Sequence, residues 1–180
     1  MPYAVIIRLD EIDSTNAEAR RRAEVGEIGP LWLTARRQTA GRGRRGRAWE
    51  SEGGNLFATL LTTTRKAPAE AAQATFVAAL AVADLLDAFA RPGAVTIKWP
   101  NDVMLGGDKA AGILVESGAH QTGGLWLAVG VGVNLAHAPN GTERPAAALA
   151  KHLRSDIAYP PSPEAAVQVL AQAFADGSER

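Results

Sequence analysis

The chain has 180 residues, of which 47% are hydrophobic and 21% charged, and we expect one globular domain over residues 1–180. It contains no cysteine, which excludes disulfide bonds, thiolate nucleophiles and cysteine-ligated metal centres. Basic and acidic residues balance at 19 each, so the chain as a whole has no charge excess that would attract polyanions.

In chain order, the first elements are a strand, a helix and a second strand. Apolar and β-branched residues predict the strands at 4–9 and 31–35. Between them, polar capping residues predict a helix over 15–23, in which Thr15 and Glu18 form a capping box.

The segment 38–54 is rich in glycine and has no apolar period, so it predicts a long loop. A loop of this length in a compact domain is usually functional or disordered. A strand at 55–63 follows, then an alanine-rich helix at 69–89 and a strand at 95–99 that Pro100-Asn101-Asp102 ends.

The last part of the chain predicts a hairpin and two short helices. Strands at 109–117 and 125–134 are joined across Thr122-Gly123-Gly124, which is typical of a hairpin turn. The tail predicts helices at 145–153 and 163–174. Strands in adjacent hairpins, combined with helices, indicate an α+β fold.

The string Gly41-Arg42-Gly43-Arg44-Arg45-Gly46 matches the G-x-G-x-x-G pattern of dinucleotide-binding proteins. That pattern should open a helix, but Ser51-Glu52-Gly53-Gly54 follows where the helix would run. We instead interpret the string as a loop whose arginines close over an anion. Glycines allow close backbone approach, and guanidinium groups bind phosphate or carboxylate oxygens in pairs.

The charge pattern alone leaves two further interpretations of this loop. Six arginines lie between residues 36 and 47 with no acidic residue among them, and such a run can be a solvated face. A nucleic-acid interface would need aromatic residues among the arginines, and only Trp49 lies nearby. We therefore expect no nucleic-acid partner.

Polar residues also lie at the ends of later strands. Lys98-Trp99-Pro100-Asn101-Asp102 on its own fits a Pro-Asn-Asp turn. Lys109 on its own would be a charge on an edge strand, but Gly112 in the same strand indicates close approach of a ligand or of backbone. The three histidines, which are predicted to be structural or surface residues because they lack metal-ligand spacing, are His120, His137 and His152.

Taken together and in this order, the motifs over roughly residues 5–135 resemble the catalytic domain of biotin protein ligases, also called biotin–acetyl-CoA-carboxylase ligases. The resemblance is carried by Asp13-Ser14-Thr15-Asn16, Gln38 to Arg47 with Trp49, Lys98 to Asp102, Lys109 with Gly112-Ile113-Leu114, and Gly130 to Asn134. It implies a mixed, largely antiparallel sheet flanked by helices. Lipoate ligases share this fold but lack the arginine–glycine loop.

The resemblance implies a two-step activity that consumes ATP. Biotin and ATP would form biotinyl-5′-AMP and pyrophosphate, and biotin would then pass to a lysine of a biotin carboxyl carrier protein or carrier domain of a carboxylase. Lys109 and Arg44 are the implied catalytic residues, because positive charge is needed where a carboxylate approaches a phosphate. Mg²⁺ is implied as a cofactor, with Asp102 as its ligand.

The resemblance also assigns residues to each substrate. The implied biotin-binding residues are Ser14, Thr15, Asn16, Gln38, Arg42, Gly43, Arg44, Lys109 and Gly112. The residues implied to bind ATP or the adenylate are Arg42, Arg45, Arg47, Trp49, Lys98, Asn101, Asp102 and Asn134.

Two departures from the family pattern keep alternatives open. Few residues precede Ser14, so we expect no DNA-binding domain and no repressor function, and the chain ends at Arg180 without the usual C-terminal β-barrel domain. A non-catalytic biotin or biotinyl-adenylate binding protein and a lipoate ligase-like acyltransferase are the alternatives. Exposed strand edges would allow a homodimer.

The sequence also predicts a cytoplasmic location without membrane contact. The longest apolar run, 76–83, is too short to span a bilayer. The N-terminus has neither the basic nor the apolar region of a secretory signal.

Overall fold

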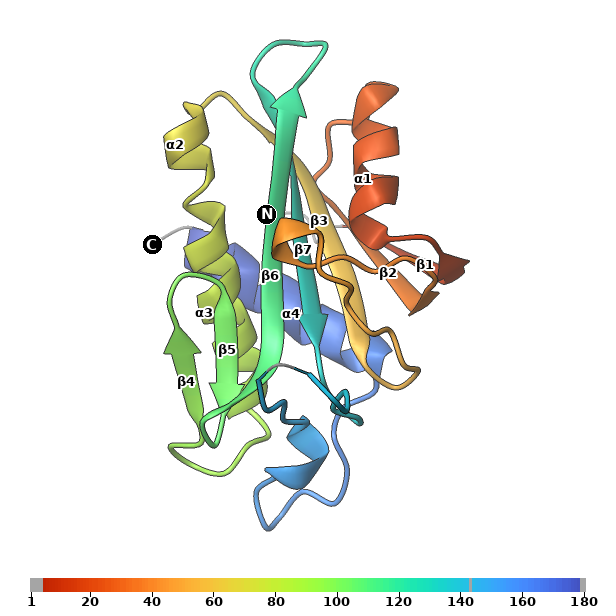
Figure 1. Cartoon of the computed structure of the whole chain (residues 1–180). Helices are drawn as coiled ribbons and strands as arrows, with labels where there is room; N and C mark the ends of the chain where they lie inside the picture. Colours follow the sequence, from red (N-terminus) through yellow and green to blue (C-terminus); the bar gives the residue numbers. More distant parts are fainter. Residues whose placement is uncertain (1–4, 143, 179–180) are drawn as a thin grey trace.

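The computed structural model describes residues 5–142 and 144–178, and its centre is a seven-stranded sheet (Figure 1). The strand order is β1-β2-β3-β7-β6-β5-β4. The strands are β1 (Val5–Ile12), β2 (Leu31–Gln38), β3 (Leu56–Thr64), β4 (Val95–Lys98), β5 (Asp102–Leu105), β6 (Asp108–Ala119) and β7 (Leu125–Val133). β1 and β2 are parallel and all other neighbours are antiparallel, which confirms the predicted α+β fold with a mixed, largely antiparallel sheet.

Helices cover both faces of the sheet (Figure 1). They are α1 (Thr15–Glu24), α2 (Pro68–Ala71), α3 (Ala74–Asp87) and α4 (Pro163–Ser178). Successive strand residues point to opposite faces, so Leu60 and Val129 pack in the large core beneath α3 and α4. Leu61 and Ala128 pack in a small core beneath α1. The α1 face is therefore only partly covered.

Two helix predictions were wrong in detail. The helix predicted at 69–89 is interrupted between α2 and α3. The helix predicted at 145–153 is limited to a 3-10 turn, η2 (Leu149–Lys151), because β6 captures the preceding backbone. Ala146 bridges Lys109, and the Ala147 amide donates to the Lys109 carbonyl at 2.9 Å. A segment bonded to a strand in this way cannot also complete helical hydrogen bonds.

The stretch Pro68–Asp87 is the one described segment that is long and apolar enough to cross a membrane. Its apolar side chains instead pack against the sheet: Val82, Leu85 and Leu86 are fully buried in the large core. We therefore assign α3 as a core helix.

Candidate functional site

A cavity of about 660 Å³ opens on the α1 face of the sheet. Its walls come from the start of α1, the end of β2, the arginine–glycine loop (residues 41–47), the β4–β5 connection, β6, β7 and, after β7, Pro139, Thr142, Arg144 and Ala146. All predicted site residues line it, namely Ser14, Thr15, Asn16, Gln38, Arg42, Gly43, Arg44, Arg45, Arg47, Trp49, Lys98, Asn101, Asp102, Lys109, Gly112 and Asn134. The structure thus brings them together, while their individual roles stay predictions.

The neutral part of the cavity wall is built by the start of α1 and the end of β2. Gln38 Oε1 accepts from the Thr15 backbone amide at 2.9 Å and lies 3.1 Å from Thr15 Oγ1. Gln38 Nε2 donates to Ser51 Oγ at 3.1 Å. These groups are uncharged donors and acceptors, so this wall suits a polar ring without formal charge.

The predicted capping box at Thr15 and Glu18 is wrong. Ser14 is the N-cap, and its Oγ accepts from the Ala17 amide at 3.5 Å. Thr15 is already helical, and its hydroxyl lies between Gln38 and Thr59 instead. The hydroxyl of Ser14 therefore caps the helix, while the hydroxyl of its neighbour Thr15 contributes to the cavity wall.

An ion pair fixes the start of α1 from outside the cavity. Both oxygens of Asp13 accept from the Arg21 guanidinium at 2.8 Å, a paired geometry that favours the ionised carboxylate. The hydrogen bond from Arg21 is the largest cause that lowers the Asp13 pKa from 3.8 to about 2. Asp13 therefore stays charged well into the acid range.

Folding stability should respond to this ion pair between about pH 4 and pH 2. Because the pKa of Asp13 is lower in the folded chain, its contribution is complete above pH 4 and is lost as the pH falls towards 2. We expect Asp13→Asn to flatten part of the acid loss of melting temperature. Asp156→Asn, which changes a carboxylate that is 71% exposed, is the matched control. Equal acid profiles for the two variants would contradict the assignment.

Trp49 lies on a floor of two glycines in neighbouring strands. Gly112 of β6 and Gly132 of β7 are cross-strand partners. A Cβ at Gly132 would lie 2.5 Å from the Trp49 ring, and one at Gly112 would lie 2.9 Å away. The glycine pair therefore makes the space in which the indole lies flat over the sheet.

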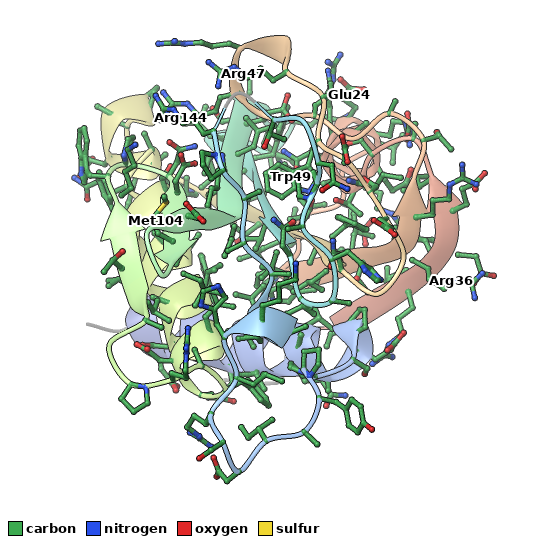
Figure 2. All side chains as sticks on the ribbon, turned by 60° about the horizontal axis from the view of Figure 1, so that its bottom comes forward. Glu24, Arg36, Arg47, Trp49, Met104 and Arg144 are labelled. Carbon is green, nitrogen blue, oxygen red and sulfur yellow. The ribbon has the colours of Figure 1, made fainter. Side chains whose placement is uncertain are left out.

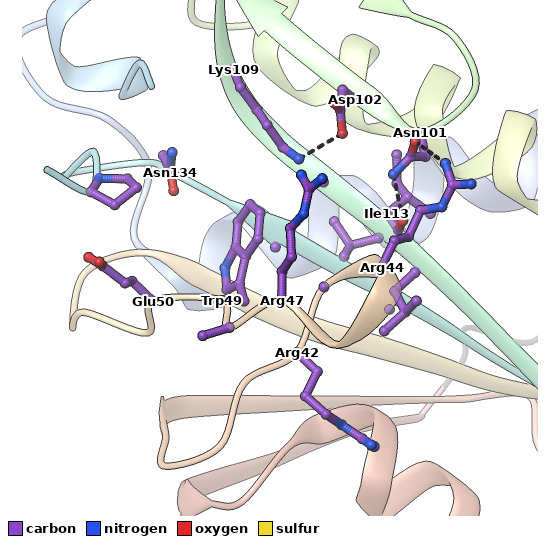
Figure 3. A pocket seen from close by; sticks show the side chains of 18 of the residues that line it. Arg42, Arg44, Arg47, Trp49, Glu50, Asn101, Asp102, Lys109, Ile113 and Asn134 are labelled. Carbon is purple, nitrogen blue, oxygen red and sulfur yellow. Dashed lines mark hydrogen bonds and ion pairs between the residues drawn. The ribbon is translucent and has the colours of Figure 1, made fainter. Parts of the chain in front are cut away.

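The cationic part of the cavity centres on Lys109 (Figure 3). Lys109 Nζ lies 2.7 Å from Asp102 Oδ1 and 5.5 Å from the centroid of the Trp49 ring. Arg44 Nη1 donates to Asn101 Oδ1 at 2.7 Å, and Asn101 Nδ2 donates to the Ile113 carbonyl at 3.3 Å. The loop and the β4–β5 connection are thereby joined across the cavity mouth.

The interpretation of Lys109 as an edge-strand charge is wrong, because β6 lies between β7 and β5. The β5–β6 register shifts between Val103 and Met104, so that Met104 pairs with Lys109. This bulge adds one residue to β6, and Ala110 and Ala111 are both fully buried. Lys109 consequently shares the cavity face with Gly112, although the two are three positions apart and regular alternation would place them on opposite faces.

The six arginines of the sequence run do not act as one group. Arg47 points towards Lys109 and Arg44 points towards Asn101, whereas Arg42 points away from both (Figure 3). Arg36 lies far from Arg47 (Figure 2), and Arg37 pairs with Glu11 at 3.2 Å. Arg36 and Arg37 thus lie outside the cavity as the solvated-face interpretation predicts, whereas the four loop arginines are exposed but line the cavity.

Two predicted residues on the ATP side differ in their surroundings. Asn134 is buried, and its Nδ2 donates to the Ala147 carbonyl at 3.1 Å, so its amide holds the segment after β7 against the sheet. Lys98 is exposed at the end of β4, next to Trp99, which stacks on Phe76 with ring centroids 5.8 Å apart.

Sequence reasoning missed several contributors to the site. Thr59 is fully buried in β3 beneath the cavity, 2.8 Å from Thr15 Oγ1. Gly130 lies beneath Asn16, and Arg144 lines the same cavity as Arg47. The alternation of valine and glycine in β7 indicates a sheet face on which side chains are absent. No pattern in the sequence around Thr59 indicates that it lies beneath the cavity.

Within the described residues, no group of three or more His, Asp and Glu side chains could hold a metal ion. The histidines have structural contacts: His120 Nδ1 lies 2.8 Å from Thr122 Oγ1, and His152 Nδ1 lies 3.1 Å from the Arg91 guanidinium. Asp102 and Glu50 are the carboxylates on the described cavity wall, and Asp102 is paired with Lys109.

Comparisons with known proteins identify the family of this chain. Residues 11–134 match the model of the biotin/lipoate A/B protein ligase family. The biotin–[acetyl-CoA-carboxylase] ligase of Paracoccus denitrificans is 46% identical over 169 residues, which are 93% of this chain and 70% of that protein. A biotin protein ligase from Leishmania major in complex with biotinyl-5-AMP has a TM-score of 0.76 at 29% identity, over 97% of this chain and 75% of that chain. The ligase from Aquifex aeolicus in complex with biotin and ATP has a TM-score of 0.74 at 27% identity, and the match covers 97% of this chain and 70% of that chain. The chain therefore belongs to the biotin/lipoate A/B protein ligase family.

Proposed function

We propose that this chain is a biotin protein ligase that forms biotinyl-5′-AMP from biotin and ATP and transfers biotin to a carrier lysine. The observation that carries this proposal is the division of one cavity into two parts. Neutral hydrogen-bonding groups of α1 and β2 suit the ring of biotin, and the cations around Lys109 suit its carboxylate and the phosphates of ATP. The ligands of the Leishmania major and Aquifex aeolicus proteins support the same assignment.

The chemistry needs positive charge where two anions meet. A biotin carboxylate oxygen bonds to the α-phosphorus of ATP, the bond from that phosphorus to the bridging oxygen breaks, and pyrophosphate leaves. Lys109 and Arg44 are proposed to lie along this path and to stabilise the charge that develops. In the second step the carrier lysine attacks the acyl carbon, loses a proton, and AMP leaves.

Trp49 is proposed to pack beside the adenine of the nucleotide. Its indole lies over the glycine pair, and its Nε1 is buried without a hydrogen-bond partner among the described residues.

Mg²⁺ is proposed as an ion that the ATP phosphates carry. The cavity fits it only in this way, because its described wall offers Asp102 and Glu50 rather than a cluster of ligands. Mg²⁺ commonly uses one or two carboxylates together with substrate phosphates. Asp102 would be its protein ligand, and the ion would offset phosphate charge.

The direct test is biotin-dependent ATP–pyrophosphate exchange on the purified chain. Exchange that requires both biotin and Mg²⁺ is expected if the domain makes the adenylate. Biotin binding without exchange would instead establish a non-catalytic binding protein. Replacing biotin by lipoate in the same assay tests the acyltransferase alternative.

Arg44→Ala should weaken retention of the adenylate. The variant loses the 2.7 Å hydrogen bond to Asn101 that joins the loop to the opposite wall. A charge-assisted hydrogen bond of this kind corresponds to about a tenfold effect or more. We expect labelled biotinyl-5′-AMP to leave the isolated complex about ten times faster. Arg37→Ala, on β2 outside the cavity, is the control, and equal release rates in the two variants would contradict the prediction.

The proposed partner is a biotin carrier protein or carrier domain of a carboxylase, because the second step needs an acceptor lysine. A cytoplasmic location is proposed with it, since ATP is abundant there. Transfer is tested by mass spectrometry of a purified carrier domain, whose mass should rise by one biotinyl group at a single lysine.

A further inference from the structure

A chain of hydrogen bonds runs beneath the neutral part of the cavity wall. We call this part, formed by Thr15, Asn16 and Gln38, the biotin floor. Asn16 Nδ2 donates to Glu116 Oε2 at 2.8 Å and to the Leu114 carbonyl at 3.2 Å. Thr59 Oγ1 lies 2.7 Å from Asn16 Oδ1 and 2.8 Å from Thr15 Oγ1. Thr15 and Asn16 line the cavity, whereas Thr59 and Glu116 lie behind its wall.

The direction of these hydrogen bonds follows from the groups that can only accept. A carboxylate and a carbonyl oxygen have no hydrogen to donate, so the network assigns the Asn16 NH₂ group to Glu116 and its oxygen to Thr59. The Asn16 oxygen also only accepts, and it takes the single hydroxyl hydrogen of Thr59. The Thr59 oxygen is left as an acceptor for the Thr15 hydroxyl.

The same reasoning applies to Gln38. Its Oε1 accepts from the Thr15 amide and its Nε2 donates to Ser51, which fixes the amide orientation. Only two hydroxyl hydrogens, those of Thr15 and Thr59, are then available for three contacts. These contacts are Thr15–Gln38, Thr15–Thr59 and Thr59–Asn16. The Thr15 hydrogen goes to Thr59, at 2.8 Å rather than 3.1 Å. Thr15 Oγ1 and Gln38 Oε1 consequently keep acceptor capacity towards the cavity.

We propose that Thr59 and Glu116 are positioning residues that set the hydrogen-bond polarity of the biotin floor. Acting through Asn16 and Thr15, they make the floor an acceptor, which favours a ligand ring that carries N–H donors. This inference rests on the proposed function and gives its site a basis for selecting the cyclic urea of biotin. A ring that offers an oxygen instead of N–H would leave the floor acceptors unpaired.

The test compares Kd values for biotin and for a biotin analogue in which one ring N–H is replaced by oxygen, measured by calorimetry. Thr59→Val removes the hydroxyl at nearly constant shape, Thr59→Ser keeps it, and Glu116→Leu removes the acceptor at the start of the chain. Thr34→Val is the matched control, because Thr34 is also buried in a strand but donates to the Phe57 carbonyl outside the cavity. Melting curves establish that each variant is folded.

The wild-type chain is expected to prefer biotin by about tenfold or more, since one unpaired polar group has that effect. Thr59→Val should lose most of this preference, and Glu116→Leu should lose part of it, because the Leu114 carbonyl still accepts from Asn16. Thr59→Ser and Thr34→Val should keep it. Folded Thr59→Val with the preference of Thr34→Val would overturn the positioning role and leave the proposed function standing. A wild-type chain that binds no biotin would overturn both. If Thr59→Val does not fold, the preference of Glu116→Leu decides.

Discussion

Lys109→Ala is expected to lower the rate of biotin-dependent ATP–pyrophosphate exchange by about two to three orders of magnitude while the domain stays folded. Lys109 Nζ is held 2.7 Å from Asp102 and over the Trp49 ring, so its charge is in place before the substrates arrive. A cation held in this way needs little rearrangement when charge develops between carboxylate and phosphate. The measurement is the exchange rate at saturating biotin and ATP.

A control distinguishes the lower exchange rate of Lys109→Ala from the effects of unfolding or of removing any one positive charge. Lys151→Ala removes an exposed lysine from the η2 turn, outside the cavity, and should exchange at the wild-type rate. Lys109→Ala should stay folded with a somewhat lower melting temperature, because it leaves the buried Asp102 Oδ1 without its partner. A folded Lys109→Ala variant with normal exchange would rule out the catalytic role.

Gly130→Ala should weaken biotin binding by about ten- to a hundredfold. Gly130 is paired with Thr59 in the β3–β7 ladder, and a Cβ at this position would overlap the Asn16 amide oxygen. Asn16 would have to leave its hydrogen bonds with Glu116 and Thr59, and the start of α1 would move with it. Overpacking of this kind typically corresponds to 1–3 kcal/mol, or about one to two factors of ten.

Gly53→Ala is the matched control for this substitution, because no atom lies within 4 Å of the Cβ that it adds. Calorimetric titration of biotin should distinguish the two variants. The double variant Gly130→Ala, Asn16→Ala should bind no worse than Asn16→Ala alone, since the overlapping amide is gone. A further loss in the double variant would show that the clash lies elsewhere.

Local patterns were sufficient to predict most of the sheet. Alternating or continuous apolar residues placed six of the seven strands, and turn residues separated them. β5 was missed because it has four residues and directly follows Pro100-Asn101, which by itself indicates a turn. The helix predicted at 145–153 failed for the opposite reason: its alanines favour a helix, but pairing with β6 overrides that preference.

The cavity could be predicted only as a set of motifs. Thr59 and Gly130 meet because β3 pairs with β7, and periodicity along the chain carries no information on that pairing. Simple strand alternation would also place Lys109 on the face opposite Gly112, and only the bulge in β6 brings both to the cavity. The resemblance to a known family supplied residues that strand periodicity would have misplaced.

The chain has no net charge, yet the described cavity wall carries seven basic and two acidic side chains. The rest of the chain is therefore net acidic, and a positive hollow in an acidic surround focuses its electric field at one opening. Small anions would therefore be guided to that opening from solution, whereas a long polyanion would find no extended track to follow. Raising the ionic strength would slow capture of the anion much more than it would change the packing beneath it.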